Sequence, residues 1–534
     1  MPGKPVLIVG AGPTGLVLAI ELARRGVPFH LIDRHPEPLG RDRAIVVKSR
    51  SLEVFDSMGL ADAFIRRGGI IRGISLFSGG TKVASVNLAG LDSPFPFDLC
   101  LPEEETERIL TEELERLGGR IERGIEFAGL EQGKRSVMTW LRPVRDGERT
   151  LEASWVIGTD GVHSGVRETI GDEFEGHDYP ARWGVADAHL AGWDQPSDHA
   201  TVQTEPPVVI SFPLRDGRWR FTFRSESEDA DVLATVGARL AAISPGAALR
   251  DPDEPQLFHT HARVARRYRV GRVLLAGDAA HACTPLEGHG MNTGIQDSHN
   301  LGWKLALVVS GAAPESLLDS YEAERRPIAQ SIARSGDDAE ARAAHLDPTA
   351  SRTLIQFLAT PEGRAAAAMA EAEIAFGYDQ SPIVGEVPDT RAIARGTRVG
   401  LRVGDAAPLQ RGNRERGNRA LRLHELVGAP GHTLFIMLGE ADPAAVDDGL
   451  ALARAAAERY RPHLQAYVVT RNAPTGEDDP NDLLCDPAGA LHERFGAEQP
   501  CLCLVRPDGH LGFRGAPPCL DSLQAHLRHV FRSG

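Results

Sequence analysis

The first 33 residues constrain the fold of this chain more than any other segment. Residues 6–9 form a short apolar run, the sequence Gly-Ala-Gly-Pro-Thr-Gly follows at 10–15, and residues 16–25 have the composition of a helix that stops at Gly26. Residues 27–32 form a second apolar run, which ends in Asp33. A strand, a glycine loop, a helix and a second strand within about 30 residues predict a βαβ unit.

The three glycines of this loop have different structural tasks. Gly10 permits a tight turn, Gly12 lets the backbone approach a pyrophosphate, and Gly15 lets the helix pack against the strand. The helix N-terminus offers free N–H groups to phosphate, and Asp33 is placed to accept hydrogen bonds from ribose hydroxyls. The segment therefore predicts a dinucleotide site, with a glycine-rich turn of another α/β fold as the alternative.

Composition limits the classes of protein to which the chain can belong. Its 534 residues suggest about three domains. The 59 basic and 74 acidic residues give a net charge of −15, which argues against nucleic-acid and anionic-membrane partners because both need basic surfaces. Six cysteines without CxxC spacing predict reduced thiols and no metal site. With no signal sequence and no apolar run of about 18 residues, we expect a cytoplasmic protein without a membrane span.

Changes of pattern along the chain predict a mixed α/β protein in four parts. Helices are expected at residues 51–59 and 103–117, and antiparallel strands at 208–214 and 219–224. The parts are a discontinuous domain at 1–70, 100–180 and 259–355, an inserted antiparallel-sheet domain at 71–99 and 181–258, a connector at 356–400, and a separate α/β domain at 401–534.

Two further motifs follow predicted strands. Residues 156–167 predict a strand, an Asp-Gly turn at 160–161 and the start of a helix. Gly277 and Asp278 directly follow a strand at 273–276, and a glycine-dense loop at 285–292 precedes a helix at 295–310. Free amides at a helix start suit an anion or a polarised carbonyl, and an Asp at a strand end suits a polyol hydroxyl. Taken alone, each motif is also compatible with an ordinary turn.

Together the three motifs resemble, in order and spacing, those of the class A flavoprotein monooxygenases, the FAD-dependent aromatic hydroxylases. The resemblance covers essentially the whole chain and is most specific in the run GDAAHACTPLEGHGMNTGIQDSHNLGWKLAL at 277–307. It implies a glutathione-reductase-like Rossmann domain for FAD and an inserted sheet that binds substrate. It also implies a thioredoxin-like C-terminal domain, as in the phenol hydroxylase and polyketide hydroxylase branch.

The resemblance implies three groups of contacts with FAD. The residues at the ADP half are Gly10, Gly12, Gly15 and Asp33. Arg43 is expected beside the cofactor, Asp160 near its pyrophosphate and Asp278 on its ribitol chain. The residues that line the isoalloxazine ring are Pro285, Gly288, Gly290, Met291 and Asn292.

Three residues depart from the family pattern. Glu103 stands where the family often has Gln, which puts that cofactor contact in doubt. Glu287 and His289 stand in the loop that commonly reads Pro-Pro-x-Gly-Gly-Gln-Gly. Beside a flavin ring they would alter the local charge or touch substrate, with a solvent-facing pair as the alternative.

The resemblance also implies a reaction. NADPH or NADH binds transiently and reduces FAD, O2 then forms a flavin hydroperoxide, and a small phenolic or polyketide aromatic substrate is hydroxylated. A base that works near pH 7 would help to deprotonate a phenol; His289 is the first candidate and His189 the second. Candidates for an aromatic wall around the substrate, with a plain core role as the alternative, are Trp183, Phe212, Trp219, Phe221 and Phe223.

Other uses of the same site stay open at this stage. The flavin chemistry could serve a Baeyer–Villiger oxidation, an epoxidation or the inactivation of an antibiotic, and a flavin-containing protein could bind a ligand without turnover. Cys501 and Cys503 share one face of a predicted strand, which favours buried thiols over a redox pair. A monomer or a homodimer is expected.

Overall fold

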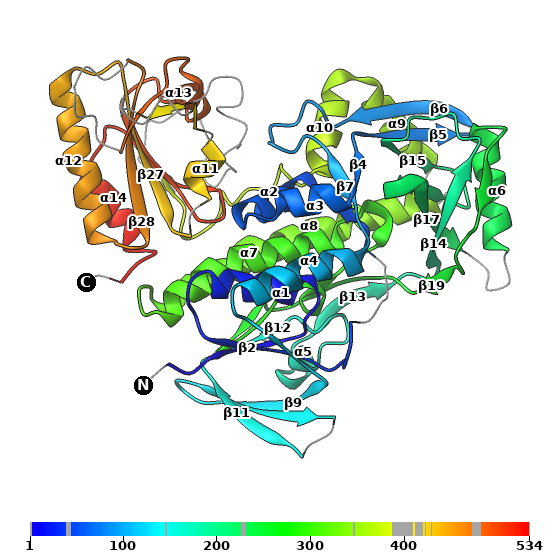
Figure 1. Ribbon diagram of the computed structural model, residues 1–534, viewed down its shortest axis with the longest axis horizontal. Helices are drawn as coiled ribbons and strands as arrows, with labels where there is room; N and C mark the ends of the chain where they lie inside the picture. Colours follow the sequence, from blue (N-terminus) through cyan, green and yellow to red (C-terminus); the bar gives the residue numbers. More distant parts are fainter. Residues whose placement is uncertain are drawn as a thin grey trace. The chain divides into compact units, whose positions relative to one another are not determined.

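Figure 1 shows a computed structural model of the chain. It describes residues 3–38, 44–144, 147–225, 231–344, 348–386, 409–411, 420–421, 423–428, 430–472 and 482–532. The chain is mixed α/β and forms two compact units. The first comprises Met1–Leu91, Phe95–His299 and Arg325–Ile374, and the second comprises Asp92–Pro94, Asn300–Glu324 and Ala375–Gly534.

The first unit contains a six-stranded sheet in the order β21-β22-β12-β1-β2-β8, with β21 (Arg269–Val270) and β8 (Ile121–Arg123) at its two edges; Figure 1 labels β2 and β12 of this sheet. The strand β1 (Val6–Val9) pairs in parallel with β2 (Phe29–Asp33) and with β12 (Trp155–Gly158). The next strand, β22 (Val273–Leu275), pairs in parallel with β12. All four residues of β1 are buried, as the apolar run predicts for a strand covered on both faces.

Helices and a smaller sheet cover this six-stranded sheet. The helix α1 (Pro13–Ala23) packs against α4 (Glu103–Arg116). A three-stranded antiparallel sheet of β9 (Ile125–Gln132), β10 (Val137–Pro143) and β11 (Arg149–Ala153) packs against the short helix α5 (Gly165–Thr169) through β9. Figure 1 shows this small sheet beside the ends of the central strands.

The inserted segments build a larger sheet in the order β18-β14-β17-β16-β15-β5-β6. Strands of both inserted segments meet in it, because β5 (Gly73–Ser78) pairs in parallel with β15 (His199–Gln203). Its other strands are β6 (Thr81–Asn87), β14 (Arg182–Ala191), β16 (Val209–Pro213), β17 (Arg218–Ser225) and β18 (Ala248–Arg250). The boundaries of the predicted domains stay a prediction.

Three helices cover this larger sheet. The helix α6 (Val232–Ile243) packs against β17 and β18, and α9 (Pro348–Ala359) and α10 (Pro361–Glu371) pack against β6. The contacts with α9 and α10 form an apolar cluster that includes Leu76, Val86, Leu358 and Ala372. The first part of the predicted connector, up to Ile374, therefore belongs to the first unit, while residues 387–400 lie outside the described residues.

Short elements and two long helices complete the part that carries the predicted motifs. The small strands β3 (Val46–Val47), β4 (Gly69–Ile71) and β7 (Asp98–Cys100) form one sheet. Two helices, α2 (Ser49–Ser57) and α3 (Ala61–Arg67), lie between β3 and β4 in the sequence. The long helices are α7 (Gly290–Val309) and α8 (Asp319–Ala343). No helix in the described part of the chain has the length and apolar character needed to cross a membrane.

The second unit has a sheet in which β31-β30-β27-β28 are consecutive. The strands β27 (His432–Gly439) and β28 (Leu464–Thr470) are parallel, while β30 (Cys501–Val505) runs antiparallel to β27 and to β31 (Leu511–Gly515). The helices α12 (Pro443–Arg459) and α14 (Leu520–Leu527) pack on this sheet.

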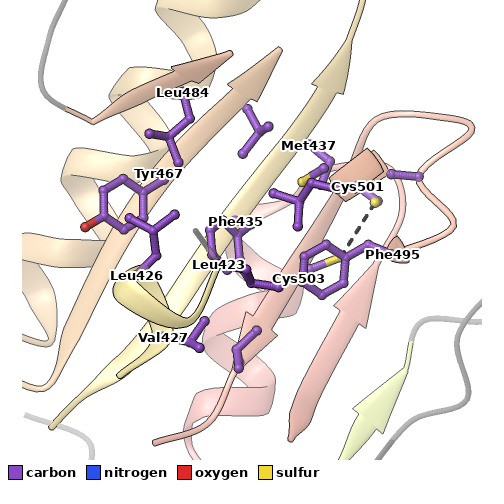
Figure 2. Close-up of a cluster of buried hydrophobic side chains, with 14 of the residues drawn as sticks. Leu423, Leu426, Val427, Phe435, Met437, Tyr467, Leu484, Phe495, Cys501 and Cys503 are labelled. Carbon is purple, nitrogen blue, oxygen red and sulfur yellow. Dashed lines mark hydrogen bonds between the residues drawn. The ribbon is translucent and has the colours of Figure 1, made fainter. Parts of the chain in front are cut away.

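Figure 2 shows the apolar core of this second unit, to which Phe435, Tyr467 and Phe495 contribute aromatic rings. The thiols of Cys501 and Cys503 lie in the same core, with their sulfur atoms 3.9 Å apart and both side chains fully buried. All six cysteines fall within the described residues, and none of them forms a disulfide bond.

Candidate active site

The three sequence motifs meet at the carboxyl ends of adjacent parallel strands. A Cβ atom added to Gly10 would overlap the carbonyl oxygen of Thr159 and lie 2.8 Å from the Cα atom of Asp160. A Cβ atom added to Gly277 would overlap the hydroxyl of Thr14. Ligands of open α/β sheets bind at this edge, so segments more than 100 residues apart in sequence form one site.

The glycine-rich loop is tightly packed on one side and open on the other. Gly10 has a φ of 105°, and a Cβ atom on Gly15 would overlap the Gly10 carbonyl oxygen. Beside Gly12, by contrast, the nearest atom to an added Cβ is a Glu107 carboxylate oxygen at 3.9 Å. No described side chain caps the start of α1, where Gly12 is the N-cap. The free N–H groups of its first turn are therefore open to a phosphate.

Asp33 lies beside this loop at the end of β2. Its Oδ2 accepts a hydrogen bond from the backbone N–H of Ala11 at 2.8 Å, and its Oδ1 accepts one from the backbone N–H of His35 at 2.8 Å. These bonds fix the carboxylate next to the phosphate-binding turn, where a ribose would lie. Nearby, burial raises the pKa of Glu107 to about 7; Arg123 opposes the rise, while the charges of Asp33 and Glu104 add to it.

Asp160 stabilises its own turn through hydrogen bonds. Its Oδ1 accepts a hydrogen bond from the Ser164 hydroxyl at 2.5 Å and its Oδ2 accepts one from the backbone N–H of Val166 at 3.2 Å. Burial raises the pKa of this carboxyl above its ordinary value. Arg167, the last residue of the motif, donates from Nη1 to the carbonyl oxygen of Ala279 at 2.9 Å and so ties the second motif to the third.

Asp278 is an exposed residue in a buried stretch. The residues from Val273 to Gly277 and from Ala279 to Ala282 are all buried, whereas Asp278 is exposed. Gly277 turns the chain at this point with a φ of 59°. The carboxylate therefore stands at the end of β22 on the open side of the site, which suits a hydrogen bond to a polyol chain.

The loop from Thr284 to Asn292 is held in place by Asn292, which is fully buried. Its Oδ1 accepts from the backbone N–H of Lys48 at 3.0 Å, and its Nδ2 donates to the carbonyl oxygens of Val46 at 2.7 Å and Gly288 at 2.9 Å. Gly288 has a left-handed φ of 67°. The other predicted ring-lining residues, which are all partly exposed, are Pro285, Gly290 and Met291.

His289 is buried in the same loop and has a carboxylate partner. Its Nδ1 lies 2.6 Å from Oε1 of Glu373, whose Oε2 accepts a hydrogen bond from the side-chain amide of Gln296. Burial works against protonation of His289, but the hydrogen bond to Glu373 and the charge of Glu373 outweigh burial and raise the pKa of the imidazole. The sequence carries no signal for Glu373, which follows α10 more than 80 residues beyond the loop.

The predicted aromatic residues fall into two groups. Trp183 and Phe212 pack with Leu286 of the cofactor loop, together with Val208 and Ile210. A different cluster, which includes side chains of α6, holds the three aromatic residues of β17, namely Trp219, Phe221 and Phe223. His189 lies at the end of β14 that pairs with β18. The structure therefore brings only Trp183 and Phe212 to the loop.

A buried glutamate missed by sequence reasoning joins the loop to the larger sheet. Oε1 of Glu340, on α8, accepts hydrogen bonds from Nε1 of Trp183 at 2.7 Å and from the Thr284 hydroxyl at 2.6 Å. Nε of Arg224 donates to its Oε2 at 3.4 Å. Arg43, also predicted as a cofactor contact, lies outside the described residues.

Comparisons with known proteins agree with this geometry. Residues 4–335 match the FAD binding domain family. The chain is 35% identical to 6-methylpretetramide 4-monooxygenase of Streptomyces rimosus over 98% of this chain and 93% of that protein. It is also 34% identical to pentachlorophenol 4-monooxygenase of Sphingobium chlorophenolicum over 61% of this chain and 62% of that protein.

Two solved structures are similar over nearly the whole chain. The anhydrotetracycline hydroxylase OxyS of Streptomyces rimosus has a TM-score of 0.74 and 30% identity, with 99% of each chain covered. A ternary complex of aklavinone-11 hydroxylase with FAD and aklavinone has a TM-score of 0.76 and 26% identity, also with 99% of each chain covered.

The fold and the site thus define a flavoprotein monooxygenase. The chain belongs to the FAD binding domain family, and the resemblance to the FAD-dependent aromatic hydroxylases is confirmed. FAD fits the residues present, because glycines leave room at the turn, an uncapped helix start faces it, and carboxylates stand at the ends of β2 and β22.

Proposed function

We propose that this chain is an FAD-dependent monooxygenase that hydroxylates a phenolic ring of a polycyclic, polyketide-type substrate, with NADPH or NADH as the reductant. The apolar cluster that joins Leu286 of the cofactor loop to Trp183 and Phe212 of the larger sheet carries this proposal. Phe212 and Leu286 are partly exposed members of this cluster and would offer an apolar contact to an aromatic ring beside the loop. Relatives named for aromatic and polyketide substrates support the choice.

The chain's own residues bind and orient the reactants. When bound, FAD supplies the redox chemistry, in which NADPH or NADH is oxidised and one atom of O2 becomes available to the ring. The overall reaction uses one NAD(P)H, one proton and one O2, places one oxygen atom on the ring and releases the other as water. The glycine loop and Asp33 would hold the ADP half, Asp278 the ribitol chain, and Asp160 the turn near the pyrophosphate.

His289 supplies the base in this proposal. With Nδ1–H donated to Glu373, Nε2 is the atom that accepts the phenolic proton, which leaves electron density on the ring carbons ortho and para to the oxygen. Glu373 raises the pKa of the imidazole above the ordinary histidine value, so Nε2 holds the proton more tightly once it has accepted it. Glu340 assists by fixing Trp183 against the loop.

We also infer the finer fold classes. A mostly parallel sheet with a glycine loop after β1 and an antiparallel three-stranded sheet beside it supports a glutathione-reductase-like Rossmann domain. In the second unit, β31-β30-β27-β28 follow the strand order 4-3-1-2, with the first two strands in sequence parallel and a helix at the end, which supports a thioredoxin-like domain. The oligomeric state, monomer or homodimer, stays a prediction.

A substrate panel tests the function. Purified protein with FAD is given phenols and polycyclic phenols or quinones, and the readouts are NAD(P)H consumption corrected for peroxide and the mass of the product. We expect tight coupling and a gain of one oxygen atom with a polycyclic phenol. Binding of these compounds without any oxygenated product would support a ligand-binding role instead. A lactone or ester product would assign the Baeyer–Villiger alternative.

A further inference from the structure

We propose that Glu373 is a positioning residue of the hydroxylation reaction, which orients His289 so that Nε2 of the imidazole receives the phenolic proton. This inference rests on the proposed function. It adds a residue from outside the three sequence motifs to the site. It also identifies a hydrogen-bond partner for His289, one of the residues that depart from the family pattern.

Polar contacts hold both oxygens of the Glu373 carboxylate in place. Its side chain is fully buried, Oε1 lies 2.6 Å from Nδ1 of His289, and Oε2 accepts a hydrogen bond from Gln296 on α7. Because both oxygens are engaged, the carboxylate fixes the plane of the His289 ring and the tautomer with a proton on Nδ1. Nε2 makes no hydrogen bond to the described residues, and 11% of the His289 side chain is exposed.

The backbone at Glu373 has an unusual conformation and is anchored by contacts on its N-terminal side. Its φ of 57° lies in the left-handed region, which is uncommon for a residue other than glycine. The preceding carbonyl oxygen, of Ala372, accepts a hydrogen bond from the backbone N–H of Arg50 at 3.1 Å. Glu371 forms an ion pair with Lys48. A strained backbone held by surrounding contacts is a feature that functional positions often show.

The charges around His289 explain why Glu373 controls it. Lys48 faces the imidazole from the turn before α2 and disfavours its protonated form, while Glu287 in the same loop favours it. Lys48 itself is paired with Glu371 and lies 3.9 Å from Asp98. Of these groups, only Glu373 contacts the imidazole directly, so it sets both the ring's orientation and its proton affinity.

The proton step can be written with these atoms. The O–H bond of the phenol breaks, its proton forms an N–H bond with Nε2 of His289, and the electron pair stays on the phenolic oxygen. The resulting imidazolium keeps its Nδ1–H hydrogen bond to the Glu373 carboxylate. The proton is returned from Nε2 when the hydroxylated product leaves as a neutral phenol.

The first test does not depend on turnover. Protein with FAD and 13C-labelled histidines is titrated by NMR, and the His289 signal is identified by its loss in His289→Gln. We expect the imidazole of Glu373→Gln to bind its proton at least about tenfold more weakly than that of the wild type. Glu362→Gln, an exposed position on α10, is the control and should leave the titration unchanged. An unchanged titration in Glu373→Gln overturns the proposal, whether or not a phenol is turned over.

The second test separates positioning from a loss of structure. With a phenol accepted in the substrate panel, His289→Gln should lower kcat/KM about 100-fold or more, and Glu373→Gln should lower it by a smaller factor. The double variant should be no slower than His289→Gln alone, and Glu373→Asp should recover part of the rate and of the wild-type pH profile. If the losses of kcat/KM in the two single variants multiplied in the double variant, and the pH profile of Glu373→Gln were unshifted, Glu373 would have a structural role only. FAD content and the melting temperature of each variant show that it is folded.

Discussion

Arg167 donates a hydrogen bond from Nη1 to the carbonyl oxygen of Ala279 at 2.9 Å, and this bond joins two motifs that lie 112 residues apart. The same guanidinium donates from Nη2 to the carbonyl oxygen of Val162 at 2.7 Å, and its Cζ lies 3.8 Å from the centre of the Phe174 ring. One buried side chain thus holds the Asp-Gly turn of the second motif against the Gly-Asp turn of the third.

Replacement of Arg167 by alanine should therefore loosen the whole site. One buried and one partly buried carbonyl oxygen would lose their donors, and we expect the free energy of unfolding to fall by about 2–4 kcal/mol. Thermal and urea unfolding of the FAD-loaded protein measure this change. Arg266→Ala, which removes an arginine with 61% of its side chain exposed, is the matched control and should have little effect. Equal stability of the two variants would contradict the proposed link.

Gly12→Ala should separate cofactor binding from folding. A Cβ atom fits at this position, since its nearest neighbour would be a Glu107 oxygen at 3.9 Å, but it would project where a phosphate approaches the backbone. We expect a wild-type melting temperature without FAD and a dissociation constant for FAD that is at least about tenfold higher. Fluorescence titration with FAD measures the second quantity.

Gly15→Ala provides the contrast with Gly12→Ala. Its Cβ atom would overlap the Gly10 carbonyl oxygen, so α1 and β1 have to move apart. We expect a lower melting temperature even without FAD. If Gly12→Ala destabilised the apoprotein as much as Gly15→Ala, the loop would not be open toward a ligand.

Asp278→Asn should weaken FAD retention with little effect on stability. The residue is exposed, so the free energy of unfolding without FAD should change by no more than about 0.5 kcal/mol. Loss of a charge-assisted hydrogen bond to the ribitol chain should raise the FAD dissociation constant about tenfold. Asp216→Asn, at a position with 88% of its side chain exposed, is the control. Unchanged FAD retention in Asp278→Asn would remove the ribitol role.

Glu107 should make stability depend on pH. Its pKa is about 7 in the folded chain and lower in the unfolded chain, so the folded state binds more protons between about pH 4.5 and 7. The contribution of this carboxyl to the free energy of unfolding is therefore fully present below its pKa in the unfolded chain. It is lost as the pH rises through 7. Glu107→Gln should unfold like the wild type near pH 4.5 and be more stable by about 1–3 kcal/mol at pH 8.

Urea unfolding at both pH values measures this difference. Glu115→Gln, at an exposed position of the same helix, is the control and should show the same stability relative to the wild type at each pH. A Glu107→Gln variant with no gain at pH 8 would mean that the carboxyl is not held neutral by its burial.

Local sequence predicted the elements that carry the motifs. The apolar run at 6–9 is β1, and the expected helix at 103–117 is α4 to within one residue at its end. The helix expected at 295–310 instead begins at Gly290. Gly290 and Gly294 lower the helix propensity of this turn, but Gly294 is needed there because a Cβ atom would overlap the Thr14 hydroxyl. Tertiary packing overrides the local preference.

The parts of the site that sequence did not reveal depend on contacts between distant segments. The alternation of Trp219, Phe221 and Phe223 does put them in one cluster, but α6 covers that cluster, and no sequence pattern showed where α6 would pack. Glu340 and Glu373 lie 56 and 84 residues from Thr284 and His289, their respective partners in the loop, and belong to no motif. Only the folded chain shows that their carboxylates meet Thr284 and His289.

The most direct test of the proposed hydroxylation follows the oxygen atom. The FAD-loaded protein, NADPH or NADH and a polycyclic phenol are incubated under 18O2, and the product is analysed by mass spectrometry. We predict a product that carries one 18O atom on an aromatic carbon, formed in proportion to the NAD(P)H consumed. Consumption of NAD(P)H that yields only hydrogen peroxide, with no labelled product from any phenol in the panel, would contradict it.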